Sequence, residues 1–213
     1  FNYKKMEEYL KYKILLLGYS EAKSFIINKL KSNAYKEKNK SSKIIEEVSF
    51  KGNFYSEERD TKVPKKVVDL IISNTPGQEN YNSITNTYFR DSDAAIILYD
   101  ITDKSSFNDL NKWIEKINNC VKIGDNEYVV FLMGAKIKII KSRDVKEQEA
   151  IEKCQEKQIE WGGEFNNGYS KEQLKKKFIE FAKILYKKIG VKNIKQKRIK
   201  LDSFTKKKRQ CCL

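Results

Sequence analysis

Residues 12–24 read YKILLLGYSEAKS, and this stretch decides the fold. Its first six residues form an apolar run that predicts a buried strand, and the helical spacing of apolar residues in 24–33 predicts a helix behind it. Strands that alternate with helices of this length predict an α/β fold, in which a mostly parallel sheet carries helices on both faces. The same alternation continues along the chain, with strands predicted at 48–55, 65–73, 94–100 and 127–133, and helices at 105–121, 144–157 and 171–189.

The loop after the first predicted strand is similar to a phosphate-binding sequence. Ligands of open parallel sheets bind at the carboxyl ends of the strands, so a site is expected in these loops. A phosphate-binding loop here reads GxxxxGK[ST]: its backbone N–H groups wrap the phosphates, its lysine reaches the terminal phosphates and its hydroxyl binds Mg²⁺. Lys23 and Ser24 match, but the loop after Gly18 is one residue short and Ala22 replaces the second glycine. Alone, the motif is a weak signal.

Three further stretches strengthen that signal because they follow in a fixed order. They are NTPGQENY at 74–81, YFR at 88–90 and AAIILYDITD at 94–103, followed by Ser105-Ser106-Phe107 and Trp113. In order and spacing, residues 12–188 resemble a small GTPase of the Ras superfamily, most of all the Rab branch, where these stretches read WDTAGQERY, YYRGA, IIVVYDVT and ESF…W. The resemblance implies a three-layer G-domain-like α/β fold with a central, mostly parallel six-stranded sheet over residues 1–190.

The resemblance also assigns roles to individual residues. It implies that GTP or GDP binds together with Mg²⁺, that Ser24 and Ser42 ligate the metal, and that Gln78 is the catalytic residue that orients the attacking water. A small insertion before Phe50 leaves the register of Ser42 open. The nucleotide-binding residues that it implies are Gly18, Lys23, Ser24, Tyr35, Gly77 and Lys136.

Several departures from the family pattern fall on the nucleotide chemistry. Asn74 replaces the aspartate that helps to retain magnesium, and an amide lacks the negative charge that a hard dication prefers. Pro76 restricts the backbone beside the switch glycine. The guanine-reading motif NKxD appears as Ala135-Lys136-Ile137-Lys138, so a cation replaces the aspartate that accepts the guanine N–H groups. We interpret Gly162-Gly163-Glu164 as an altered form of the last nucleotide loop, which reads SAK in the family.

Two functional hypotheses follow from these departures. In the first, the chain is a Rab-like GTPase that acts as a membrane-tethered switch in vesicle trafficking, with GTP binding and hydrolysis impaired. In the alternative, it is a pseudo-GTPase, an interaction or scaffold protein that binds no nucleotide. The sequence leaves open whether the chain is an enzyme. In both cases effector and regulatory proteins would bind through the switch regions.

The chain ends in Cys211-Cys212-Leu213, directly behind the basic run 206–209. Stable anchoring takes two lipid chains, or one chain and a polybasic patch, and this terminus offers both. The terminus resembles the Rab prenylation signal, which implies lipidation of Cys211 and Cys212 by a prenyltransferase with an escort protein. We therefore expect residues 191–213 to be a flexible basic tail that anchors the protein to the cytoplasmic face of an anionic endomembrane, with a cytosolic pool.

The net charge of +15 suggests nucleic-acid binding as a competing reading. Eight basic residues and one acid lie between positions 195 and 209, so that segment alone carries +7 of the surplus. The basic residues are 39 lysines and 5 arginines, whereas specific phosphate and base recognition favours arginine. We therefore expect no nucleic-acid partner. The longest apolar run, 94–99, is far short of the ~20 residues that a membrane span needs.

Overall fold

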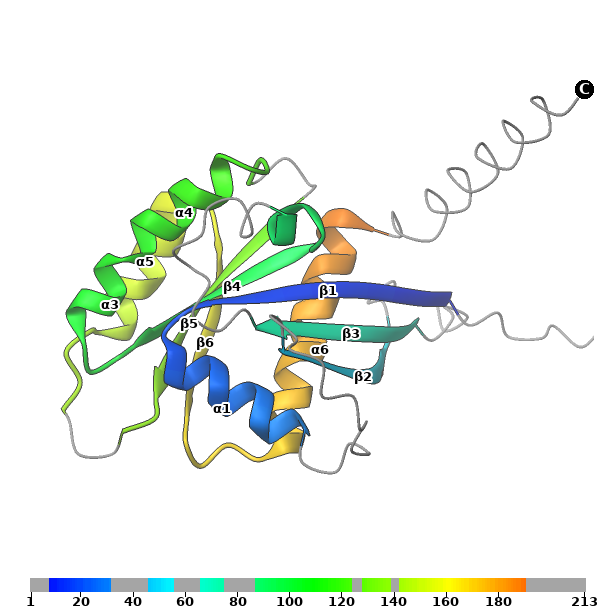
Figure 1. The fold of residues 1–213 in the computed structure, drawn as a ribbon, viewed down its shortest axis with the longest axis horizontal. Coiled ribbons are helices and arrows are strands. Elements are labelled where there is room, and N and C mark those ends of the chain that lie inside the picture. The colour runs from blue at the N-terminus through cyan, green and yellow to red at the C-terminus, as the bar shows by residue number, and fades with distance from the viewer. Residues whose placement is uncertain are drawn as a thin grey trace, which may run out of the picture.

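A computed structural model describes residues 8–31, 46–55, 66–74, 87–123, 128–138 and 142–190, and all structural statements below concern these ranges. The six strands form one sheet in the order β2-β3-β1-β4-β5-β6 (Figure 1). They are β1 (Glu8–Gly18), β2 (Glu46–Phe54), β3 (Lys66–Asn74), β4 (Ala94–Asp100), β5 (Val129–Lys136) and β6 (Glu160–Asn166). The helices are α1 (Ser20–Lys31), α3 (Lys104–Asn108), α4 (Leu110–Asn118), α5 (Glu147–Lys157) and α6 (Lys171–Ile189).

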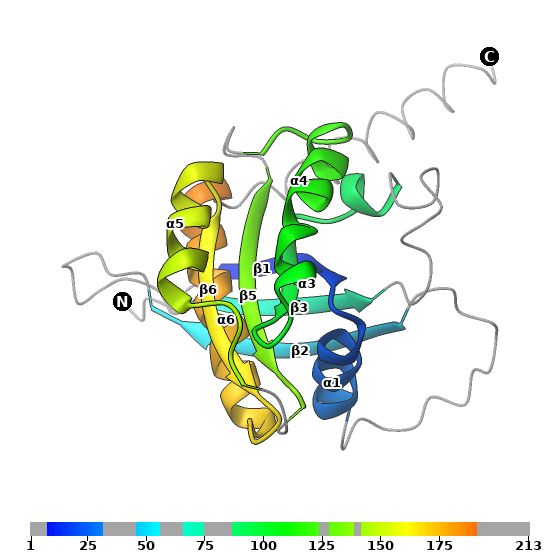
Figure 2. The same ribbon diagram turned by 90° about the vertical axis from the view of Figure 1, so that its left-hand side faces the viewer.

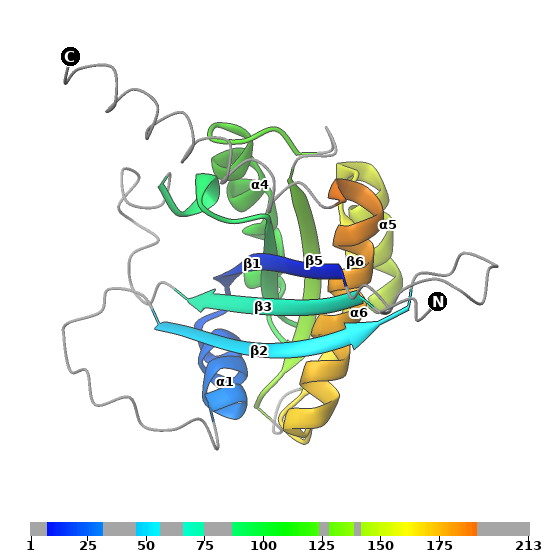
Figure 3. The same cartoon turned by 90° about the vertical axis from the view of Figure 1, so that its right-hand side faces the viewer.

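Four of the five strand pairings are parallel, and only β2 runs antiparallel to its neighbour β3. Figure 3 shows the opposed arrows of β2 and β3, and Figures 2 and 3 show the twist that turns β5 and β6 across β1, β2 and β3. The predicted six-stranded, mostly parallel sheet of an α/β fold is confirmed. Because the strands run parallel, the carboxyl ends of β1, β3, β4, β5 and β6 meet at one edge of the sheet.

Helices cover both faces of the sheet, as predicted. Helices α1 and α6 share one buried cluster with the strands, whereas α3, α4 and α5 share the other (Figure 1). Strand β1 contributes to both clusters because successive side chains point to opposite faces. Ile14 and Leu16 belong to the cluster under α1 and α6, and Leu15 and Leu17 belong to the opposite one. This is why the strand reads as a continuous apolar run rather than an alternating one.

The helices differ from the sequence expectation in two places. The predicted helix at 105–121 is two shorter helices, α3 and α4, which meet at Asp109. The predicted helix at 24–33 begins at Ser20 instead, four residues earlier. Helix α6 begins with a capping box, in which Ser170 and Gln173 each accept a hydrogen bond from the other's backbone N–H.

Gly18 ends β1 in a conformation that only glycine adopts easily. Its φ is +82°, and a Cβ at this position would lie 2.2 Å from the carbonyl oxygen of Leu98. The next residue, Tyr19, donates its backbone N–H to that same oxygen at 2.9 Å. The chain therefore passes directly over β4 as it leaves the sheet, and this close approach positions helix α1.

No helix in the described ranges is long and apolar enough to cross a membrane.

We predict that Gly18→Ala lowers the free energy of unfolding by about 2 kcal/mol or more, because it combines a positive φ with a clash against backbone. Chemical denaturation followed by circular dichroism measures this. The matched control is Gly168→Ala, where the new Cβ would lie 3.1 Å from the Asn166 side chain and φ is not positive. The control should cost about 0.5 kcal/mol or less. Equal losses in the two variants would contradict the role given to Gly18.

Candidate nucleotide-binding site

The edge formed by the carboxyl ends of the strands brings the predicted nucleotide segments together. Strand register places Asn74 beside Leu16, Leu98 beside Gly18, Ala135 beside Asp100 and Asn166 beside Lys136. The segments that follow β1 and β5 thus lie at the same edge as Asn74 and Asp100, which end β3 and β4. This is the location expected for a ligand in an open parallel sheet.

The segment that was predicted to wrap phosphates is mostly helical. Helix α1 begins at Ser20, so Tyr19 alone connects it to β1. The backbone N–H of Lys23 donates to the carbonyl oxygen of Tyr19 at 3.1 Å, which is an ordinary helical hydrogen bond. The side chain of Lys23 is buried, with 2% of its surface exposed, whereas Ser24 is exposed to solvent. Lys23 and Ser24 therefore lie on different sides of the helix.

Ala22 and Glu21 occupy the positions next to Lys23 in this first turn. Ala22 is fully buried in the core cluster under α1 and α6, so its methyl group packs into the core at the position where the family motif has a glycine. Glu21 is exposed, and its two carboxylate oxygens accept separate hydrogen bonds. Ser20 Oγ donates to Oε2 at 2.8 Å, and Lys138 Nζ donates to Oε1 at 3.0 Å. These contacts, first from Ser20 and then from Lys138, lower the pKa of Glu21.

Lys138 stands where the NKxD motif has the aspartate that accepts the guanine N–H groups, and its partner here is Glu21. The two residues are 117 positions apart in sequence, and Glu21 raises the pKa of Lys138. Ala135 is fully buried within β5, and Lys136 ends that strand half-buried. The carbonyl oxygen of Lys136 accepts the backbone N–H of Asn167 at 3.2 Å, which ties the end of β5 to the loop after β6.

The sequence predicted the last nucleotide loop, the counterpart of SAK, at residues 162–164, and this prediction is wrong. Gly162, Gly163 and Glu164 lie inside β6, and the loop after that strand begins at Asn167. The two glycines have structural roles: a Cβ on Gly162 would lie 3.1 Å from the carbonyl oxygen of Leu132 in the adjacent strand, and Gly163 has a positive φ of +79°. Turn-forming residues at 166–170 (NNGYS) were the signal that could have located the loop correctly.

Asn74 and Asp100 are buried polar residues at the ends of β3 and β4. Asn74 is 1% exposed, and its Oδ1 has no hydrogen-bond partner in the described part of the chain. Asp100 has a structural role, because its Oδ1 accepts from the backbone N–H and the hydroxyl of Thr102 at 2.9 and 2.7 Å. The family-like stretch 94–103 thus continues from a buried strand into a turn that its own side chains stabilise.

Tyr19 lies close to Asp100. Burial, and after it the Asp100 carboxylate, raise the pKa of Tyr19. The buried Tyr19 hydroxyl nevertheless has no partner of hydrogen-bond geometry within the described ranges. The site therefore holds two polar atoms without partners there, the Tyr19 hydroxyl and Asn74 Oδ1.

Some predicted site residues lie outside the described residues. They are Tyr35, Ser42, Gly77 and Gln78, together with Pro76 and the terminal pair Cys211 and Cys212. Of the predicted site, the structure therefore places Gly18, Lys23, Ser24 and Lys136, and with them the variant positions Asn74, Ala135 and Lys138. No cluster of three or more acidic, cysteine or histidine residues that could hold a metal ion occurs among the residues described.

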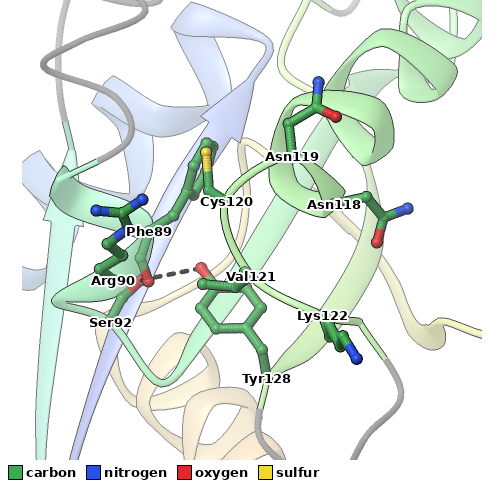
Figure 4. A pocket seen from close by; sticks show the side chains of 9 residues that line it. All are labelled: Phe89, Arg90, Ser92, Asn118, Asn119, Cys120, Val121, Lys122 and Tyr128. Atoms are coloured by element: carbon green, nitrogen blue, oxygen red, sulfur yellow. Dashed lines mark hydrogen bonds between the residues drawn. The ribbon is translucent and has the colours of Figure 1, made fainter.

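A separate hollow of about 470 Å³ lies between the segment that precedes β4 and the end of α4. Figure 4 shows Arg90, Cys120 and Lys122 around it, and the hydrogen bond of 2.9 Å between the hydroxyls of Ser92 and Tyr128. None of the residues implied by the family resemblance lines it. We therefore do not count it as part of the nucleotide site.

The parallel sheet, the helices on its two faces and the loops at the strand ends define a G domain of the small GTPase class. The model of the Ras family matches residues 13–187, and the chain belongs to this family. It is Rab-like, as the resemblance implied.

Curated relatives carry Rab names. The Ras-related protein RabC of Dictyostelium discoideum is 29% identical over 211 residues, covering 97% of this chain and all of the relative. The Ras-related protein Rab-21 of Geodia cydonium is 31% identical over 144 residues, covering 67% of this chain and 58% of the relative. The Ras-related protein Rab-11B of Dictyostelium discoideum is 34% identical over 115 residues, or 54% of this chain and 50% of the relative.

We predict that Tyr19→Phe leaves the free energy of unfolding unchanged or raises it by up to about 1 kcal/mol, because a buried hydroxyl without a partner is destabilising. Tyr128→Phe is the matched comparison, since it removes the hydroxyl that pairs with Ser92, and it should lower the free energy by about 1 kcal/mol. Thermal unfolding of both variants tests this. A clear loss in Tyr19→Phe would show that its hydroxyl is bonded to Asp100.

Proposed function

We propose that this Rab-like protein is a lipid-tethered member of the vesicle-trafficking machinery in which GTP binding and hydrolysis are impaired. Rab proteins generally bind GTP or GDP with Mg²⁺ and act at membranes through effectors and regulators. The observation that carries the proposal is the early start of helix α1 at Ser20. It leaves one residue, Tyr19, where the family has a loop that wraps phosphates.

The phosphate position lacks two properties that a nucleotide needs. The N–H of Lys23 is already used by the carbonyl oxygen of Tyr19, so it cannot turn toward a phosphate without opening the first turn of the helix. In addition, Glu21 places a carboxylate in that first turn. A negative charge there repels phosphates, whereas helix N-termini attract them.

The residues at the positions expected to contact the base and the metal also support impaired nucleotide binding. Lys138 presents a cation where guanine offers two N–H donors, and the loss of a charge-assisted hydrogen-bond pair costs about 1.5–3 kcal/mol for each bond. Asn74 supplies a buried oxygen acceptor, but that oxygen is neutral, and magnesium prefers carboxylates and phosphates. The described residues therefore do not fit a Mg²⁺–GTP complex as they stand.

Any nucleotide that still binds would use the positions implied by the family. We propose that Gly18, Lys23, Ser24, Tyr35, Gly77 and Lys136 would contact it, with Ser24 and Ser42 as metal ligands and Gln78 as the catalytic residue. In the limit where none binds, the chain is a pseudo-GTPase that presents effector surfaces independently of nucleotide. The ion pair between Glu21 and Lys138 favours this alternative, because the two side chains bind each other instead of a ligand.

Membrane attachment is assigned to the last residues of the chain. We propose that residues 1–190 form the G domain and that residues 191–213 are a basic tail lipidated at Cys211 and Cys212. A prenyltransferase and an escort protein would deliver it to the cytoplasmic face of an anionic endomembrane. The Rab names of the relatives and the paired cysteines behind basic residues support this proposal.

Protein purified under native conditions in the presence of Mg²⁺ should contain far less than one guanine nucleotide per chain. Denaturation followed by anion-exchange chromatography measures the nucleotide released. A conventional Rab protein purified in parallel serves as the positive control. Stoichiometric GDP or GTP from this chain would overturn the claim of impaired binding.

The double variant Cys211→Ser, Cys212→Ser should move from the membrane fraction to the soluble fraction when expressed in eukaryotic cells. Loss of both acceptor thiols removes both lipid chains, and a basic tail alone binds membranes only weakly. Cys120→Ser is the matched control, since it changes a thiol within the G domain and should not alter fractionation. Membrane association that survives the double change would refute lipid anchoring.

A further inference from the structure

The first observation is that aromatic side chains join the elements around the expected nucleotide position. Phe25 in α1 contacts Phe165 near the end of β6, with ring centroids 5.9 Å apart. Phe165 in turn contacts Tyr169 in the following loop at 6.1 Å. Tyr19 and Ile137, from the segments after β1 and β5, pack against the same core cluster. The chain's own apolar side chains thus gather where the strands end.

The second observation is the bridge between Glu21 and Lys138. It joins the first turn of α1 to the segment after β5, with 3.0 Å between Lys138 Nζ and Glu21 Oε1. In a nucleotide-bound family member the ligand joins these two segments, because its phosphates contact the first and its base contacts the second. Here two side chains of the protein make that connection.

The charges of the pair match the positions that the ligand's groups would occupy. The Glu21 carboxylate lies in the first turn of α1, where a negative charge complements the partial positive charge of the helix N-terminus. That is the electrostatic role a phosphate would fill. Lys138 neutralises this carboxylate, and Ser20 Oγ holds its second oxygen.

We propose that Glu21 and Lys138 form an internal latch that replaces the bridging nucleotide and holds the first turn of α1 against the segment after β5. The latch is built from two charged residues, each of which is unfavourable for a nucleotide by itself, and their charges compensate each other as a pair. The proposal rests on the proposed function, because a tightly bound GTP would occupy the same two segments. It gives the domain one closed conformation without a ligand.

The latch acts locally rather than on global stability. Its side chains are 57% and 44% exposed, and exposed ion pairs add little to the free energy of folding. Its expected effect is therefore on the local separation of the first turn of α1 from the segment after β5. Local opening exposes backbone amides to hydrogen exchange without unfolding the domain.

The test is amide hydrogen exchange by mass spectrometry on the full-length protein and four variants. Glu21→Gln and Lys138→Gln each break the pair, and peptides that cover residues 19–25 and 135–138 should exchange about two- to fivefold faster. The double variant Glu21→Lys, Lys138→Glu restores the pair with reversed polarity and should return exchange close to the wild-type rate. Lys112→Gln breaks a surface pair with Asp109 on α4 and should leave these peptides unchanged.

Either of two results would overturn the latch. One is wild-type exchange at both segments in Glu21→Gln and Lys138→Gln. The other is a charge-reversed variant that exchanges as fast as the single variants. The nucleotide content of the same preparations is measured separately. Stoichiometric GDP in the wild type would refute impaired binding, while the exchange rates alone decide whether the two side chains hold the two segments together.

Discussion

Strand β1 is the constraint on which the rest of the structure depends. It pairs with β3 on one side and β4 on the other, and it buries side chains on both faces of the sheet. Its end at Gly18 lies against the backbone of Leu98, and helix α1 begins two residues later. This arrangement places Glu21 of α1 within hydrogen-bond distance of Lys138 after β5.

The departures from the family pattern lie at the carboxyl-end edge of the sheet, and the packed core is intact. Apolar positions in the strands and helices still build two well-packed layers, and the Asp100 turn still supports itself through Thr102. Residues near the expected nucleotide position have partners within the chain: the Lys23 N–H bonds the Tyr19 carbonyl oxygen, Glu21 bonds Lys138, and Phe25 contacts Phe165. The two core clusters do not depend on these contacts, since a fold and the site that it carries draw on different residues.

Sequence patterns located the helices and strands more accurately than the residues at which they begin and end. The run 94–100 is apolar because β4 is covered on both faces, and that signal is local and strong. The start of α1 was missed because the glycine-to-lysine spacing suggested a loop, whereas Ser20 to Lys23 form a helical turn. The two glycines of β6 suggested a loop for a similar reason, but Gly162 packs against the neighbouring strand and Gly163 adopts a positive φ within β6. The contact between Glu21 and Lys138 spans 117 residues, and no local pattern encodes it.

The hydroxyl of Tyr12, in the middle of β1, donates to the carbonyl oxygen of Gly190 at 3.1 Å. Gly190 follows the last turn of α6, and Ile189 before it is buried. This hydrogen bond and the burial of Ile189 fasten the C-terminal end of α6 to a central strand of the sheet, so fraying of that helix end would have to break a contact with the core.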